Sequence, residues 1–207
     1  MLRRLYFALL FFALILPAAY AAPTPSILVF GDSISAAYGM RVEEGWVSLL
    51  QKKLSAQGYG YHVVNASVSG ETTDGGRARL ARALEVHHPA IVILELGGND
   101  GLRGLPLDEA KSNLEAMIGM SAKGGAGVLL LGMRIPPNYG AAYTEKFHAI
   151  YGELARKYRL PFVPFLLDKV ALNPDMIQAD GLHPNAQAQP RLLDAIWPTL
   201  QSLLTRS

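Results

Sequence analysis

Short apolar runs alternate with amphipathic stretches along most of the chain, a pattern that predicts strands followed by helices. Residues 90–94 are continuously apolar, as expected of a central parallel strand that is covered on both faces. Residues 143–158 instead carry apolar side chains at helical spacing and predict an amphipathic helix. The full series of predicted elements comprises strands at 27–30, 61–64, 90–94, 128–131 and 162–165, and helices at 43–57, 76–87, 108–122, 143–158 and about 185–204.

Alternation of strands and helices predicts an α/β fold, a three-layer α/β/α sandwich around a flavodoxin-like, five-stranded parallel sheet. Right-handed crossovers then fix most of its topology. Prolines mark the fifth strand as an edge strand, and Pro198 is expected to bend the last helix. We see no repeat, linker or low-complexity segment, so residues 22–207 are predicted to form one domain.

The first 21 residues differ in kind from the rest. A basic start at Arg3 and Arg4 precedes an almost wholly apolar stretch at 5–16, and Ala19-Tyr20-Ala21 fits a cleavage site. These are the three regions of a secretory signal peptide. The apolar stretch is shorter than the roughly 20 residues of a spanning helix, so a membrane anchor is the less favoured interpretation. We therefore expect cleavage after Ala21, export to the periplasm or beyond, and no stable membrane anchor afterwards.

Removal of this segment also changes the charge. The 207-residue chain has a formal charge of +2, and the segment carries two arginines and no acids, so the mature chain is formally neutral. No nucleic-acid partner is therefore expected. The chain has no cysteine and must be stable without disulfides. It also lacks an HExxH pattern, and we expect neither a metal nor another cofactor.

Polar loops follow three of the predicted strands. They are Gly31-Asp32-Ser33, residues 65–70, and Gly97-Gly98-Asn99-Asp100. Ligands of parallel sheets bind at the carboxyl ends of the strands, where these loops meet. The sequence thus predicts a site along this edge.

Ser33 could be a nucleophile or simply the cap of a following helix. A serine nucleophile needs a general base, and His183 lies in a loop where Asp180 precedes it by three residues. A carboxylate at that distance can accept the Nδ1 proton and leave Nε2 facing the serine. The alternative is an Asx turn with an exposed histidine. The other histidines lie within or at the ends of predicted strands and helices, where packing or surface roles are favoured.

Acyl transfer also needs donors for an oxyanion. Gly70 permits a close backbone approach and Asn99 carries a side-chain amide, although a turn and a loop cap would explain them equally well. Asp32 adjoins Ser33. We interpret it as structural, with its side chain directed away from the edge and accepting backbone N–H groups of a nearby loop.

Four segments occur in an order and spacing that resemble the four blocks of the GDSL or SGNH hydrolase family: FGDSIS, NASVSGETT, ELGGNDGL and DGLHPN. Residues 96–104 and 134–140 are particularly similar to a subgroup of bacterial periplasmic thioesterases, lysophospholipases and arylesterases. The resemblance covers nearly all of the chain after residue 21. Two departures are mild: Ile34 replaces the leucine that names the motif, and Ala37 stands where glycine is common.

The resemblance implies a catalytic triad of Ser33, Asp180 and His183. It also implies an oxyanion hole formed by the N–H groups of Ser33 and Gly70 and the side chain of Asn99. The substrates would be aryl esters, fatty acyl thioesters or lysophospholipids, hydrolysed through an acyl-enzyme. We expect the enzyme to be a monomer. We expect the substrate to contact Gly70, Asn99, Leu102 and Pro136. The loops along this edge are too apolar for a typical sugar cleft, which favours an acyl chain.

Three alternatives remain open at this stage. A carbohydrate O-deacetylase of the same fold is the first, and a non-enzymatic flavodoxin-like binding module is the second. No GxGxxG or Walker pattern supports the binding module. An ordinary α/β-hydrolase is the third, but it would place its serine in a GxSxG turn, which the sequence around Ser33 does not match.

Overall fold

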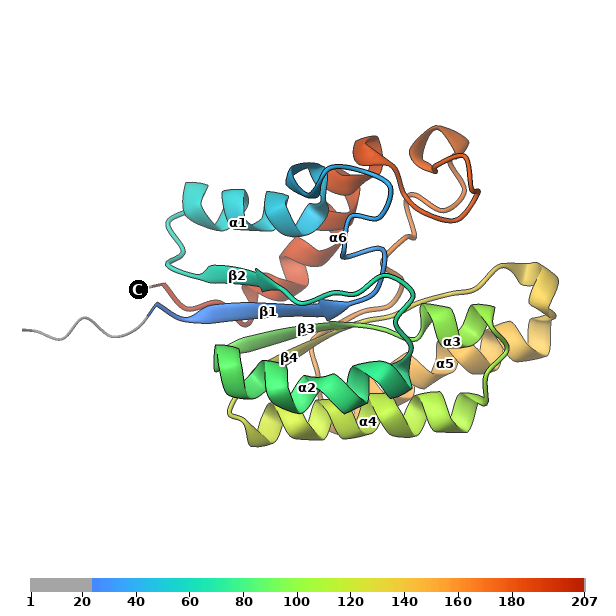
Figure 1. Ribbon diagram of the computed structural model, residues 1–207, viewed down its shortest axis with the longest axis horizontal. Coiled ribbons are helices and arrows are strands. Elements are labelled where there is room, and N and C mark those ends of the chain that lie inside the picture. Colours follow the sequence, from blue (N-terminus) through green and yellow to red (C-terminus); the bar gives the residue numbers. More distant parts are fainter. Residues whose placement is uncertain (1–23, 207) are drawn as a thin grey trace, which may run out of the picture.

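Five parallel strands form one sheet in the order β2-β1-β3-β4-β5 in a computed structural model that describes residues 24–206 (Figure 1). The strand order confirms the predicted flavodoxin-like parallel sheet. Successive strands pair in register, for example Val29 with Ile93 and Leu94 with Leu130. The strands are β1 (Ser26–Gly31), β2 (His62–Asn65), β3 (Ile91–Glu95), β4 (Gly127–Leu131) and β5 (Phe162–Val163).

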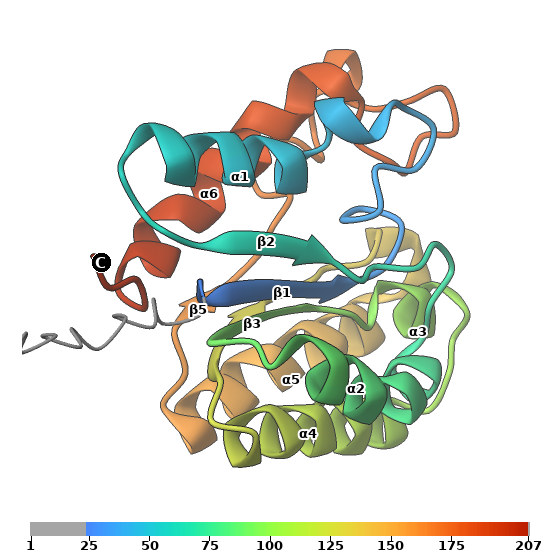
Figure 2. The same cartoon turned by 60° about the vertical axis from the view of Figure 1, so that its left-hand side comes forward.

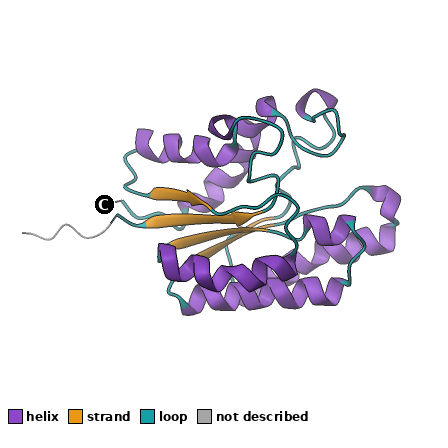
Figure 3. Cartoon of the chain, in the orientation of Figure 1, coloured by secondary structure: helices purple, strands orange, loops and turns teal. Residues whose placement is uncertain are grey.

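Helices cover both faces of the sheet and complete the three layers (Figures 1 and 3). Helices α1 and α6 pack together on one face, while α2, α4 and α5 cover the other, as the rotated view in Figure 2 also shows. The helices are α1 (Trp46–Ala56), α2 (Thr73–His87), α3 (Gly98–Leu102), α4 (Leu107–Lys123), α5 (Ala141–Tyr158) and α6 (Gln189–Gln201).

The core lies where the central strands meet the two helical layers. All five residues of β3 are buried, which explains why its sequence shows no alternation of polar and apolar side chains. On the strand flanking it, Phe30 is fully buried beneath the helices, and Trp46 anchors the start of α1 in the same core. Apolar burial of this extent is the main stabilising contribution to the fold.

The structure confirms the order of the predicted elements and shifts several of their ends. Strand β5 has only two residues, because Pro164 cannot donate to the ladder. Helix α6 begins at Gln189 rather than near Asn185. The Asn185 side chain instead accepts the N–H groups of Gln187 and Ala188 and caps a separate 3₁₀ turn. Pro198 lies inside α6, which continues to Gln201.

Helix α2 begins three residues earlier than predicted, and α3 was not predicted at all. Thr72 caps α2, and the buried carboxylate of Asp100 accepts the N–H of Thr73 at 2.9 Å. Negative charge at the start of a helix is stabilising, so Asp100 outweighs the weak helix propensity of Gly75 and Gly76. The predicted signal peptide at 1–21 lies outside the described residues. Within the described range, no helix is both long enough and apolar enough to cross a bilayer.

Gly97 joins β3 to α3 with a backbone that disfavours any other residue. Its φ is +111°, and a Cβ atom there would collide with the Tyr151 hydroxyl, which donates to the Leu96 carbonyl at 2.9 Å. The connection to α3, the helix that carries Asn99, thus depends on a glycine at this position.

We expect Gly97→Ala to lower the free energy of unfolding by about 1–3 kcal/mol, the usual cost of a residue held in such a backbone conformation. Gly119→Ala is the matched control. Gly119 lies within α4 with no atom near the position of an added Cβ, so this change should stabilise by about 0.5–1 kcal/mol. Chemical denaturation of the two variants measures both. Equal effects would mean that the Gly97 backbone is unstrained.

Candidate active site

The carboxyl ends of β1, β2 and β3 bring three loops to one edge of the sheet. Ser33 follows β1 in a turn in which the Ala36 N–H donates to the Asp32 carbonyl at 2.9 Å and the Tyr38 N–H donates to the Ser33 carbonyl at 3.1 Å. Ala37 within this turn has a φ of +59°, where glycine would be unstrained. Ser33 retains 9% exposure, so its hydroxyl is held in a nearly buried turn that opens toward the loops.

Ser33, His183 and Asp180 form a continuous hydrogen-bonded series. The His183 Nε2 atom lies 2.9 Å from the Ser33 Oγ atom, and Nδ1 lies 2.6 Å from the Asp180 Oδ2 atom. An ionised Asp180 can only accept, so Nδ1 carries the proton and Nε2 is left as the acceptor for the serine hydroxyl. This is the arrangement that activates a serine nucleophile.

Backbone groups fix the charge of Asp180. Its Oδ1 atom accepts the N–H groups of His183 at 3.0 Å and Leu182 at 2.9 Å. These two bonds, followed by the His183 side chain, lower the pKa of Asp180 to about 2. The carboxylate therefore stays ionised across the whole range in which a histidine can act as a base.

Two further residues brace the imidazole, and neither was identified from the sequence. The rings of Tyr38 and His183 are 4.5 Å apart at a tilt of 40°. Gln178 Nε2 donates to the carbonyls of Tyr38 at 2.8 Å and Pro184 at 3.0 Å, which ties the serine turn to the histidine loop. The contacts of Tyr38 with His183 and with Gln178 join segments far apart in the chain, so no local sequence pattern could have revealed them.

The predicted oxyanion donors lie on the same edge but differ in how they are engaged. Among the described residues, neither the Ser33 N–H nor the Gly70 N–H donates a hydrogen bond. Gly70 has a φ of +79°, and its carbonyl accepts the Arg103 guanidinium at 2.9 Å. Two backbone donors are thus available beside the serine hydroxyl.

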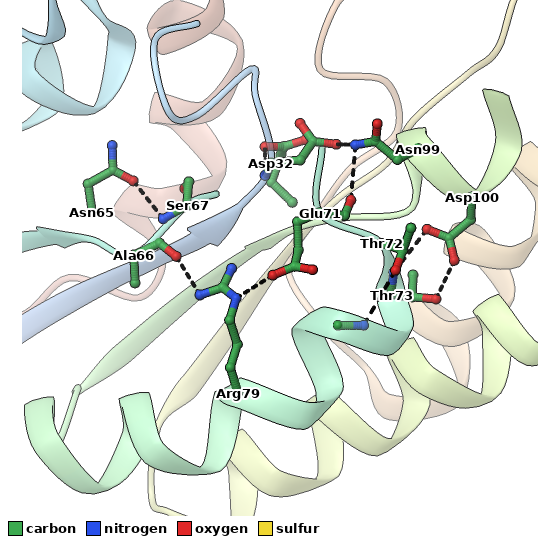
Figure 4. A network of polar contacts seen from close by, with 12 residues as sticks. Asp32, Asn65, Ala66, Ser67, Glu71, Thr72, Thr73, Arg79, Asn99 and Asp100 are labelled. Carbon is green, nitrogen blue, oxygen red and sulfur yellow. Dashed lines mark hydrogen bonds and ion pairs between the residues drawn. The ribbon is translucent and has the colours of Figure 1, made fainter. Parts of the chain in front are cut away.

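Asn99 already uses both hydrogens of its amide. Its Nδ2 atom donates to Asp32 Oδ2 at 3.1 Å and to the Glu71 carbonyl at 2.9 Å (Figure 4). Asn99 can serve an oxyanion only by exchanging one of these partners.

The interpretation of Asp32 needs a correction. It accepts one backbone N–H, from Ile34 of its own turn at 3.1 Å, and its other oxygen binds the Asn99 side chain rather than a neighbouring loop's backbone.

A cavity of about 250 Å³ opens beside Ser33 and His183. Its walls include Gly70 and Asn99 and are otherwise mainly apolar, with contributions from Tyr38, Leu102, Met133, Ile135, Leu167 and Leu182. The structure does not place Pro136 in this wall. Ile135 is buried and lines the cavity, whereas Pro136 is exposed and is not among its lining residues.

The model of the GDSL-like lipase/acylhydrolase family matches residues 29–190, which include Ser33, Gly70, Asn99, Asp180 and His183. The chain belongs to this family. Its membership confirms the family resemblance and the class of enzyme expected from the sequence.

Other members of the GDSL-like family match over nearly their whole length. Esterase TesA of Pseudomonas aeruginosa is 51% identical over 93% of this chain and 95% of its own. Thioesterase 1/protease 1/lysophospholipase L1 of Escherichia coli is 41% identical over 94% of this chain and 92% of its own. A crystal structure of TesA superimposes with a TM-score of 0.85 and 52% identity, covering 86% of this chain and 99% of that one. These matches confirm the predicted fold.

We expect Asp180→Asn to lower kcat/KM for an aryl ester by about 10³–10⁴-fold. The two backbone N–H groups would retain the amide oxygen and turn the amide NH₂ toward His183 Nδ1, which forces a proton onto Nε2. Asp175→Asn, an exposed position in the same region, is the control and should leave the rate unchanged.

The same carboxylate predicts a pH dependence of stability. Because the pKa of Asp180 is lowered from 3.8 to about 2, its contribution to stability is complete above the unfolded-state value and is lost as the pH falls through about 2. Denaturation curves of the wild type and Asp180→Asn should therefore differ by a constant amount above pH 4 and converge in stronger acid. A difference that persists in acid would contradict this origin.

Proposed function

We propose that this chain is a serine esterase and thioesterase that hydrolyses acyl esters and thioesters through an acyl-enzyme on Ser33. The observation that carries the proposal is the 2.9 Å contact between His183 Nε2 and Ser33 Oγ at the mouth of an apolar cavity. A hydroxyl with a positioned base, beside a space for an acyl group, is what acyl transfer requires.

The reaction begins when Ser33 Oγ attacks the substrate carbonyl and His183 Nε2 takes the hydroxyl proton. Asp180 stabilises the imidazolium that forms. The N–H groups of Ser33 and Gly70 point their partial positive charge at the developing oxyanion, and Asn99 adds a third donor if it releases Glu71 or Asp32. The imidazolium then protonates the departing alcohol or thiol. Water, activated by the same histidine, hydrolyses the acyl-enzyme and restores Ser33.

The apolar wall supports an acyl chain as the group held in the cavity. Leu102 and Ile135 line this space together with Met133 and Leu167. Relatives named esterase, arylesterase and thioesterase/lysophospholipase agree with substrates of this class. Among these, we favour aryl esters, fatty acyl thioesters and lysophospholipids over acetylated sugars, whose hydroxyl groups need more polar partners than this wall offers.

We also propose that the enzyme acts as a periplasmic monomer on small molecules, after removal of residues 1–21. The basic and apolar regions and the small-residue site at Ala19–Ala21 support this export. Mass spectrometry of the protein recovered from a periplasmic fraction tests the processing. An N-terminus at Ala22 would agree with it, and retention of Met1 would contradict it.

Replacement Ser33→Ala should lower kcat by about 10⁴–10⁶-fold, since loss of the nucleophile disables the triad as a unit. A fluorophosphonate probe should label the wild type and leave the variant unlabelled. Ser69→Ala is the matched control, because Ser69 lines the same cavity without a base beside it, and this variant should still be labelled. Wild-type turnover by Ser33→Ala would refute the proposed mechanism.

A series of p-nitrophenyl esters tests the acyl class. We expect kcat/KM to rise with chain length over the first few methylenes, by up to about fourfold for each one buried, since each contributes about 0.8 kcal/mol. Ile135→Ala should weaken this dependence, and Pro136→Ala, outside the cavity wall, should leave it unchanged. A sharp preference for acetyl over longer chains would instead support a deacetylase.

A further inference from the structure

A buried pair of carboxyl groups lies directly beneath the nucleophile turn. Glu95 ends β3 and is fully buried, and it sits beside Gly31 in the sheet register. Its Oε2 atom accepts the Ser35 hydroxyl at 2.6 Å and the Asp32 N–H at 3.2 Å. A Cβ atom at Gly31 would overlap Glu95 Oε2, so glycine makes room for this carboxyl group. One side chain thus ties β3 to the turn that carries Ser33.

The hydrogen bonds around the pair locate a proton. Asp32, only 2% exposed, accepts the Ile34 N–H at Oδ1 and the Asn99 amide at Oδ2. The Oε1 atom of Glu95, by contrast, finds no donor among residues 24–206. The bond from the Asp32 N–H to Glu95 Oε2 places both carboxyl groups in the same buried volume, where the charge of Asp32 raises the pKa of Glu95. Two ionised carboxylates have no hydrogen to share, so one member of such a pair must be protonated.

We propose that Glu95 is a neutral carboxylic acid in the folded enzyme and donates its Oε1 proton to Asp32, so that a single negative charge orients the Asn99 amide. Each oxygen of Asp32 already accepts a donor, which favours its ionised form, whereas both donors to Glu95 within residues 24–206 bind Oε2 and leave Oε1 without one. Glu95 has a fully buried oxygen with no donor among the described residues, which favours its protonated form. Glu95 is therefore a positioning residue that acts on the active site through Asp32.

The electrostatic surroundings agree with this assignment. Burial, followed by the charge of Asp32, raises the pKa of Glu95 well above 4.5. Burial also raises the pKa of Asp32, to about 6, against the lowering effect of its hydrogen bonds and of His183. At neutral pH the pair then holds one proton, on Glu95.

Other titratable groups face the pair from the elements around it. His183 is close enough to lower the pKa of Asp32, and the buried Tyr151 hydroxyl of α5 lies within the field of Glu95, Asp32 and Asp100. Among the described residues, no lysine or arginine forms an ion pair with either member of the pair. Replacement of Glu95 by glutamine leaves all of these neighbours in place.

Glu95→Gln tests the proton directly, because glutamine reproduces the donor and acceptor of the neutral acid. Glutamate is ionised in the unfolded chain at neutral pH, so the wild type must take up a proton when it folds and the variant must not. The free energy of unfolding of the wild type, relative to that of the variant, therefore falls as the pH rises. From about pH 6.5 upward, until the pH reaches the raised folded-state pKa of Glu95, the ratio of the wild-type to the Glu95→Gln unfolding constant should rise about tenfold per pH unit.

Glu44→Gln is the matched control. Glu44 lies on the surface, and its bonds with Arg41 lower its pKa, so it is ionised in both states throughout this range. The ratio of the wild-type to the Glu44→Gln unfolding constant should not change with pH. A Glu95→Gln ratio that is equally flat would show that Glu95 is ionised in the fold and would overturn the proposal.

Steady-state kinetics test the positioning role of Glu95, which rests on the proposed function. The pH dependence of stability tests the protonation of Glu95 and does not depend on that function. Glu95→Ala should lower kcat by about tenfold or more with little change in KM, because Asp32 loses a hydrogen-bond partner and Asn99 loses its fixed acceptor. Glu95→Gln should recover most of that rate. Equal loss in both variants would contradict the positioning role. Persistent activity in Ser33→Ala would instead refute the function and leave the stability result standing.

Discussion

The parallel register between β1 and β3 sets the level at which the catalytic groups emerge. Gly31 pairs with Glu95, so the chain leaves both strands at the same point. Ser33 follows two residues beyond one strand end and Asn99 four beyond the other. A shift of one residue in this register would turn alternate side chains to the opposite face and separate the hydroxyl from the amide. The buried apolar faces of the two strands prevent such a shift, and thus the hydrophobic core fixes the geometry of the polar edge.

The carboxyl groups of the site have pKa values that are shifted in opposite directions by two different environments. Asp180 lies toward solvent and accepts two backbone N–H groups, so its pKa falls and its charge is permanent. Asp32 and Glu95 lie in the core beside each other, where burial raises the pKa of both. A permanent charge suits the residue that must stabilise an imidazolium. A shared proton suits the pair beneath the serine, because two charges in that volume would repel each other and destabilise the turn.

Local patterns explain how much the sequence could predict. Strand and helix order follows from apolar periodicity, and Ser33, Asp180 and His183 stand out because each lies in a short loop of distinctive composition. The five-residue helix α3 is too short to show periodicity. Tyr38 depends on a contact across 145 residues, which no local window contains. Which of Ile135 and Pro136 faces the cavity depends on the backbone direction at that point, and apolar composition alone does not reveal it.

The predicted oxyanion donors differ in the hydrogen bonds that they already make. The Ser33 N–H donates no hydrogen bond among the described residues, and Ser33 lines the cavity beside His183. Asn99, by contrast, is fully satisfied by Asp32 and Glu71. In the proposed mechanism, the backbone N–H groups of Ser33 and Gly70 therefore lose no protein partner when the oxyanion forms. Asn99 gains only the difference between two hydrogen bonds, so its contribution to the rate depends on how readily Asp32 or Glu71 releases it.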